Sequence, residues 1–167
     1  MKYAFLTACA AALLSSCGYH LNGVKPANMA AMNSFCVNMF DNGTTAPNVA
    51  VQMTTALSDF LQRDGTYRAA SPSEADFTVE GRVKEIARSP WTMQYEDAYH
   101  SLEVGVTVYV DYMVRDNHTG KELTRGTASG QGSFFNDQGN VQSALDSALS
   151  YATRRAAEDI VNRLTNQ

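Results

Sequence analysis

The sequence has little excess charge of either sign, and it lacks any long apolar run after its first sixteen residues. Its 13 Lys and Arg residues are outnumbered by 17 Asp and Glu residues, which gives a formal net charge of -4. A mildly acidic domain repels a phosphate backbone, so no nucleic-acid partner is expected. No later stretch has the roughly 20 apolar residues that a membrane-spanning helix needs. The aromatic content of 10% nevertheless predicts a folded domain.

Motifs for catalysis and metal binding are also missing. The serines include no Gly-x-Ser-x-Gly sequence, and no glycine-rich phosphate loop opens a helix. His20, His100 and His118 have no second ligand at a recognisable spacing. Glu96 and Asp97 are adjacent, so on a strand their side chains would point apart and could not form a catalytic pair. We therefore expect no enzyme activity, no catalytic residue, no metal site and no cofactor.

Cysteine is scarce, with three residues in the chain, and their positions predict their uses. Residues 1–16 contain one charge, Lys2, followed by an apolar run, which is typical of a secretory signal peptide. Cys9 would leave with this segment, and Cys17 would start the mature chain. Cys36 would then have no partner for an intramolecular disulfide. The alternative is an ordinary signal peptide whose neighbouring cysteine enters a disulfide.

The sequence Leu14-Ser15-Ser16-Cys17 resembles the lipobox of bacterial lipoproteins. The resemblance implies that the thiol of Cys17 is diacylated and that its amine is acylated. A thiolate nucleophile forms the thioether, and three acyl chains, at about 0.8 kcal/mol per buried CH₂, make a permanent anchor. Gly18 replaces the aspartate that retains such lipoproteins at the inner membrane. This implies a lipid-anchored protein on the periplasmic side of the outer membrane.

Two-residue periodicity predicts strands, and three- to four-residue periodicity predicts helices. The alternating segments predict four strands, at Ser34 to Phe40, Phe77 to Lys84, Leu102 to Val114 and Leu123 to Phe134. The helical spacing predicts two helices, from Pro47 to Asp64 and from Val141 to Leu164. Turn residues at Asp41-Asn42-Gly43 are expected to end the first strand, and Ser89-Pro90 to end the second.

This β-α-β-β-β-α order favours an α/β two-layer sandwich, a four-stranded mixed sheet with two helices on one face. The first two strands flank a helix and should be parallel, whereas the last three should form an antiparallel meander. Small residues share one face of the fourth strand, at Gly126, Ala128, Gly130 and Gly132, which suggests that a helix backbone packs close there. The opposite sheet face is amphipathic and carries Glu103, Thr107, Tyr109, Asp111, Met113 and Arg125.

The chain also resembles the LptE family of outer-membrane lipoproteins. The resemblance begins at Cys17-Gly18-Tyr19-His20-Leu21 and continues through Ser133-Phe134-Phe135 and Arg155-Ala156-Ala157-Glu158. It implies a non-enzymatic protein that assists assembly of the lipopolysaccharide-transport β-barrel, an LptD-like protein, and plugs this barrel. The membrane contact would be made by the N-terminal lipid.

The resemblance also implies how the chain is divided. Residues 1–16 would be a lipoprotein signal peptide, 17–33 a lipidated N-terminus and tether, and 34–167 a single LptE-like α/β domain. Family members bind lipopolysaccharide partly through basic side chains at two places. In this chain the loop at 91–102 has no Lys or Arg, and the segment after Ser133-Phe134-Phe135 has none before Arg154. Direct contact with lipopolysaccharide therefore stays open.

Aromatic residues dominate the energetics of protein interfaces, so Trp91, Tyr95 and Tyr99 are candidate partner contacts. Packing within their own loop is an equally weighted alternative. A second hypothesis for the whole chain is an envelope lipoprotein that activates or scaffolds a periplasmic enzyme, or a module that binds a small ligand. Recovery of a large barrel protein from detergent-solubilised envelope would distinguish the two hypotheses.

Overall fold

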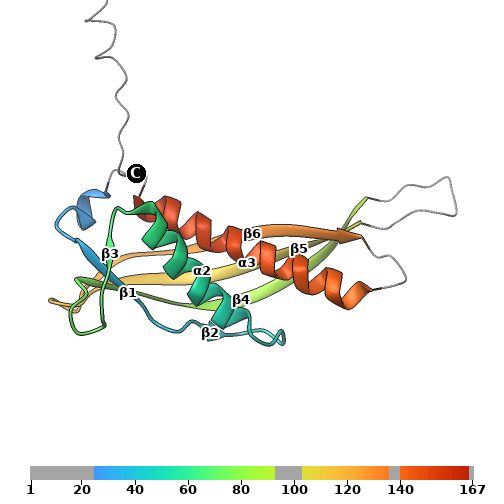
Figure 1. Cartoon of the computed structure of the whole chain (residues 1–167), viewed down its shortest axis with the longest axis horizontal. Coiled ribbons are helices and arrows are strands. Elements are labelled where there is room, and N and C mark those ends of the chain that lie inside the picture. The colour runs from blue at the N-terminus through green and yellow to red at the C-terminus, as the bar shows by residue number, and fades with distance from the viewer. Residues whose placement is uncertain (1–24, 93–102, 136–139, 166–167) are drawn as a thin grey trace, which may run out of the picture.

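The computed structural model describes residues 25–92, 103–135 and 140–165. Helices α2 (Val49–Asp64) and α3 (Val141–Thr165) lie side by side over one face of a single elongated sheet (Figure 1). A 3-10 helix at Ala27–Met29 precedes the first strand. The predicted two-layer α/β architecture, with both helices on one sheet face, is therefore confirmed.

The described part of the sheet contains six strands. They are β1 (Ser34–Val37), β2 (Asp41–Asn42), β3 (Arg68–Ala69), β4 (Phe77–Thr92), β5 (Glu103–Asp116) and β6 (Glu122–Phe135). Their order is β3-β1-β4-β5-β6, with β2 also paired to β4. The pairs β1–β3, β1–β4 and β2–β4 are parallel, whereas β4, β5 and β6 form an antiparallel meander. The predicted parallel crossover and the meander are both confirmed.

The prediction of a four-stranded sheet is wrong, because two strands of two residues each join it. Asp41–Asn42, expected as a turn, pairs in parallel with β4. Arg68–Ala69, which follows α2, pairs in parallel with β1. Two residues are too few to show alternation in a sequence. The unpaired backbone groups of the longer neighbouring strands hold these segments in the sheet.

Strand β4 is longer than predicted, because Ser89-Pro90 does not end it. The strand continues to Thr92, and Pro90 lies opposite Val104 of β5. Past Val83, where the pairing with β2 ends, β4 has a neighbour on one side only among the described strands. Proline is tolerated in such an edge segment, since its missing N–H costs no ladder hydrogen bond there.

A β-bulge at Lys84 changes which residues of β4 face the helices. Val83 lies opposite Val110, but the register then shifts, so that Ile86 lies opposite Val108. One extra residue in a strand reverses the alternation of its side chains from that point on. Ile86 therefore packs against the core, although strict alternation from Val83 would have turned it away.

The core lies between the helices and the covered face of the sheet. The central valines of this face are fully buried: Val79, Val83, Val106, Val108, Val110 and Val114. All of them except Val106 pack against residues at helical spacing on α2 and α3, including Met53, Leu57, Leu61, Ile160 and Leu164. Val106 packs against Phe134 and Ala148. The prediction that the alternating valines of β4 and β5 share the helix-covered face is confirmed.

Helix α3 packs directly on the backbone of β6. A Cβ atom added to Gly130 would overlap the carbonyl oxygen of Ala152 and the backbone nitrogen of Ala156. One added to Gly132 would lie 2.6 Å from the carbonyl oxygen of Ala148. Glycine is thus required at these positions for the close approach of helix and strand, as the sequence predicted.

The long axis of the domain has two distinct ends (Figure 1). At one end, which we call the tether end, the 3-10 helix meets the start of β6, where Asn28 Nδ2 donates to the carbonyl oxygen of Leu123 (2.6 Å). At the other, the far end, β6 finishes at Phe135 and α3 begins at Val141.

Candidate partner-binding surfaces

The face of the sheet opposite α2 and α3 has no covering element among the described residues, and we call it the open face (Figure 1). The strand register arranges its side chains in rows across β4, β5 and β6. Two neighbouring rows are Glu80-Met113-Arg125 and Arg82-Asp111-Thr127. The open face therefore mixes charged, hydroxyl and thioether groups, which agrees with its predicted amphipathic character.

The charges of the open face are largely neutralised in pairs. Three ion pairs join Glu80 to Arg115, Asp111 to Lys84 and Glu122 to Arg125, with N–O distances of 2.8, 3.7 and 2.6 Å. The hydrogen bond from Arg125 lowers the pKa of Glu122 and raises the pKa of Arg125. Exposed pairs of this kind add little to stability. They do make a polar surface whose groups already have partners.

A groove of about 410 Å³ crosses the open face around Gly81. A side chain at Gly81 would point to the helix-covered side, where it would overlap the carbonyl oxygen of Asp111 and the ring of Phe40, so this glycine makes room for Phe40 in the core. Met39, which is 63% exposed, and Met113 line the sides of the groove. Methionine adapts easily to irregular partners. The groove can therefore receive a side chain from another protein.

A larger cleft of about 960 Å³ lies on the opposite side of the sheet, between the first turns of α2 and α3. Its apolar part is formed by Ile86, Leu145 and Leu149. Arg88 of β4 and Asp146 of α3 give it charges of both signs. Its volume is in the range of small-molecule sites. Within the described ranges, no group of His, Cys, Asp and Glu side chains could hold a metal ion.

Asp76 fixes the chain at the tether end. Its Oδ2 accepts hydrogen bonds from the backbone N–H groups of Asn33 (2.8 Å) and Ser34 (2.9 Å). Its Oδ1 lies 3.2 Å from Nε2 of His118 in the β5–β6 hairpin. The N–H of Asn33, followed by His118 and Ser34, lowers the pKa of Asp76 to about 2. The carboxylate thus joins the start of β1 to the hairpin.

The predicted site residues lie mostly beyond the described part of the chain. Trp91 falls within β4, between the paired residues Pro90 and Thr92. Tyr95, Tyr99 and Cys17 lie outside the described residues. The open-face groove and the cleft between the helices had no sequence prediction. Both depend on residues brought together from distant segments, for which the sequence has no local signal.

The chain is similar to a known protein family in sequence and to several solved structures in fold. A family model described as "LptE: Lipopolysaccharide-assembly" matches residues 32–164. Three similar solved structures are the hypothetical protein CT253 from Chlamydia trachomatis, a minor lipoprotein from Acinetobacter baumannii and rare lipoprotein B from Shewanella oneidensis. Their TM-scores are 0.56, 0.51 and 0.51, and their identities are 12%, 15% and 12%.

These alignments cover 79%, 82% and 78% of this chain, and 95%, 99% and 92% of the other chains. At such low identity the likeness establishes the fold alone. None of the curated protein sequences matches the chain. Among the described residues, neither helix is both long enough and apolar enough to span a membrane.

Proposed function

Because the chain belongs to the LptE family of lipopolysaccharide-assembly proteins, we propose that it assists assembly of the lipopolysaccharide-transport β-barrel and plugs it. The observation that carries this proposal is the extent of the family match. Residues 32–164 include all six described strands, helix α2 and nearly all of helix α3. The match therefore concerns the whole folded domain and not a single motif.

The open face supports the role of a plug. The interior of a transmembrane β-barrel is polar, unlike its lipid-facing exterior. A domain enclosed there needs a surface whose polar groups are satisfied, because unpaired buried charges are costly. The ion pairs of the open face, such as Arg115 with Glu80, meet this need. Net positive charge is not required.

The shape of the domain supports the same role. Strand β4 has 16 residues, which at about 3.3 Å per residue corresponds to roughly 50 Å. The hydrocarbon core of a bilayer is about 30 Å thick. The domain is therefore long enough to fill much of a barrel when it enters along its long axis.

A lipid at Cys17 would hold the domain beside its partner, on the periplasmic side of the outer membrane. The described chain begins at Lys25, whose ammonium group donates to the carbonyl oxygen of Met32 (2.6 Å) at the tether end. The residues from Cys17 to Lys25 can span roughly 26 Å when fully extended. Such a short tether raises the effective concentration of the domain at the membrane.

Direct binding of lipopolysaccharide by the isolated domain should be weak. Binding of a multiply phosphorylated glycolipid relies on Lys and Arg side chains. On the described open face, Arg115 and Arg125 are each engaged by a carboxylate. Tight, salt-sensitive binding of lipopolysaccharide by the domain alone would contradict this part of the proposal.

The cleft between α2 and α3 favours a second candidate function, which is binding of a small ligand or a peptide of an envelope enzyme. The apolar floor at Ile86 and Leu145, with Arg88 beside it, would suit a ligand that has an apolar part and an anionic group. The two functions differ in their partner, and one purification experiment can separate them.

The test is purification of the tagged full-length lipoprotein from detergent-solubilised envelope. A large barrel protein recovered in stoichiometric yield is the expected result. Asp111→Lys, which breaks an ion pair on the open face, should lower that yield, whereas Asp146→Lys, the same charge change at an exposed position of α3, should not. Absence of the barrel from every eluate, together with normal barrel assembly after depletion of this protein, would refute the proposal.

A further inference from the structure

Strand β6 forms one long edge of the sheet. It pairs with β5 from Glu122 to Phe135, and the strand order gives it no described neighbour on its other side. An edge strand presents a row of backbone N–H and C=O groups that another strand can bind. The direction of these groups can be read from one contact. The N–H of Ser129 donates to Oδ2 of Asp159 on α3 (3.3 Å), so it points away from β5.

The direction found for Ser129 also fixes the direction of the other backbone groups of β6, because these groups alternate along an antiparallel strand. Backbone N–H and C=O groups of one residue point to the same side, and the side changes with every residue. The backbone groups of Thr127, Gln131, Ser133 and Phe135 therefore point outward like those of Ser129. Asp159 binds the N–H of Ser129, which leaves the outward groups from Gln131 to Phe135 available for a neighbouring strand.

The free edge of β6 lacks the usual protection against pairing. Natural edge strands carry charges, prolines or bulges that prevent another strand from adding. The second half of β4, which is also at an edge of the described sheet, has both a bulge at Lys84 and a proline at Pro90. By contrast, the ten residues from Gly126 to Phe135 include no charged residue and no proline.

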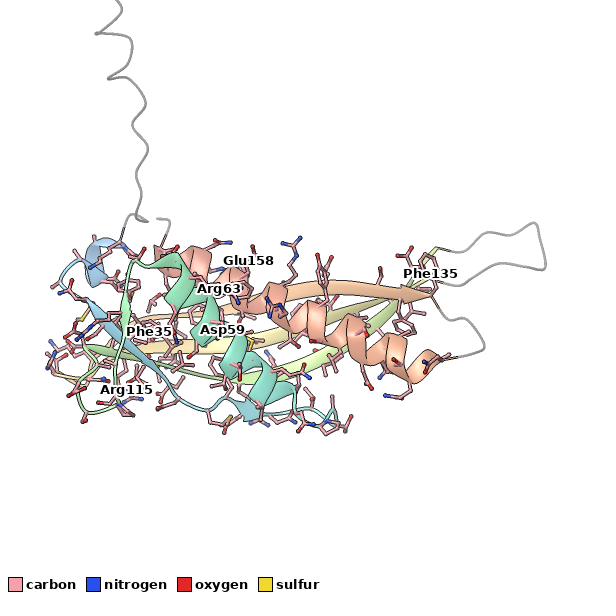
Figure 2. All side chains as sticks on the ribbon, viewed as in Figure 1. Phe35, Asp59, Arg63, Arg115, Phe135 and Glu158 are labelled. Atoms are coloured by element: carbon pink, nitrogen blue, oxygen red, sulfur yellow. The ribbon has the colours of Figure 1, made fainter. Side chains whose placement is uncertain are left out.

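Exposed aromatic side chains flank this unprotected edge on both faces. Phe135, which is 58% exposed, projects at the far end of β6 (Figure 2). On the helix side, Tyr151 of α3 is 53% exposed, and its ring lies beside Gly132. The guanidinium of Arg155 lies over the ring of Tyr151, 5.5 Å from the ring centre. An added strand could bury both rings, which favours a partner with apolar side chains.

We propose that the β6 edge from Gln131 to Phe135 binds an extended, uncharged segment of the barrel partner as an additional β-strand. The inference rests on the proposed function. The strands of a closed barrel have no free edge, so the segment would come from a loop or a chain end. Its backbone would pair with β6, and its apolar side chains would cover Phe135 and Tyr151.

A second copy of this chain does not fit the same edge. Antiparallel pairing of two β6 strands would place both α3 helices on the same face. Since α3 sits directly above Gly130 and Gly132, the two helix axes would be separated by about one strand spacing, roughly 5 Å. Packed helices need about 8–10 Å. A segment without a covering helix avoids this overlap.

The test places a photo-crosslinking amino acid at Gln131 of the full-length lipoprotein in cells. The matched control is Ala87, because Ala87, Thr107 and Gln131 form one row across the open face, with the control at the protected edge. The expected result is a crosslink from position 131 to a segment of the barrel that position 87 does not reach. The crosslinked peptide should map to a loop or chain end of the barrel.

Two substitutions test the backbone contact itself. Gln131→Pro removes one outward N–H and no hydrogen bond to β5, so it should lower recovery of the barrel about tenfold. Because proline could perturb folding, Gln131→Lys provides a second variant, with Gln131→Asn, which keeps the backbone N–H and adds no charge, as its control. Thermal unfolding of each purified variant shows whether the domain itself is intact.

The outcomes separate this inference from the proposed function. Full recovery of the barrel with both Gln131→Pro and Gln131→Lys, or crosslinking of positions 87 and 131 to the same barrel segment, would overturn the edge contact and leave the plug role standing. A crosslink from position 131 to another copy of this chain would overturn the stated occupant. Failure to recover any barrel with the unmodified protein would refute the proposed function, and the inference with it.

Discussion

The hydroxyl of Tyr67 donates a 2.9 Å hydrogen bond to the carbonyl oxygen of Leu164, a residue 97 positions later in the chain. This bond ties the segment after α2 to the last turn of α3. Tyr67 is buried, and its ring packs edge-on against Phe77 at 5.0 Å between centroids. The end carbonyls of a helix have no partner within the helix. Tyr67 thus closes the core at the tether end and satisfies one such carbonyl.

Replacement of Tyr67 with Phe should destabilise the domain by about 1–2 kcal/mol, because a buried carbonyl loses its partner. Burial, followed by the charge of Asp64, raises the pKa of Tyr67 to about 12. Between pH 10 and 12 the unfolded chain releases this proton while the folded chain keeps it, so stability falls as pH rises. Chemical denaturation of Tyr67→Phe should show a smaller fall over this range. An unchanged alkaline profile would contradict the assignment.

Acid should loosen the tether end through Asp76. Its folded pKa of about 2 lies below the ordinary value of 3.8. The unfolded chain therefore binds more protons between these values, and stability is lost as pH falls from about 4 to about 2. Asp76→Asn should lower stability at pH 7 and reduce the acid dependence, measured by denaturant unfolding. Asp146→Asn, an exposed control, should change neither.

Long periodic elements could be predicted from the sequence, because each buries a continuous apolar face. The alternation of valines from Val104 to Val114 predicted β5, and Gly65 predicted the end of α2. The structure confirms the latter: Gly65 adopts a φ of 76° and its N–H donates to Leu61. Small residues along β6 likewise predicted the close approach of α3.

Features set by tertiary pairing could not be predicted. Pro90 indicated a strand end, yet it lies at a free edge where a missing N–H has no cost. The two-residue strand at Asp41–Asn42 has a turn-like composition, and its pairing depends on the backbone of β4. The groove on the open face likewise requires Met39, from the segment between β1 and β2, to lie near Met113 and Asp111 of β5. Such contacts have no periodic signal.

The two faces of β5 should differ in their sensitivity to truncation. Val108 is fully buried under the helices, whereas Thr107 is half-buried on the open face. Val108→Ala should cost about 1–3 kcal/mol through lost transfer free energy and a residual cavity. Thr107→Ala should cost much less in the isolated domain. Equal losses in chemical denaturation would mean that a further layer covers the open face.

A single methyl group added between α3 and β6 should clearly lower the stability of the domain. A Cβ at Gly130 meets the backbone of α3, at Ala152 and Ala156, which cannot move without separating helix and sheet. Overpacking of this kind costs about 1–3 kcal/mol or more. At Gly126, on the same face, a Cβ would meet the ring and hydroxyl of Tyr112 at 3.0–3.2 Å. Gly130→Ala should therefore lower the unfolding temperature more than Gly126→Ala, and the reverse order would contradict this packing.

Loss of the lipid should change where the protein is found but not the stability of its folded domain. Cys17 precedes every described contact of the domain, the first of which involves Lys25. Cys17→Ala should therefore leave the unfolding temperature unchanged but release a soluble or uncleaved form from the acylated membrane fraction. Barrel recovery should fall, because the tether no longer raises the effective concentration of the domain. Cys36→Ala, the same change at a half-buried position in β1, should stay membrane-bound. An acylated, membrane-bound Cys17→Ala protein would exclude Cys17 as the lipid site.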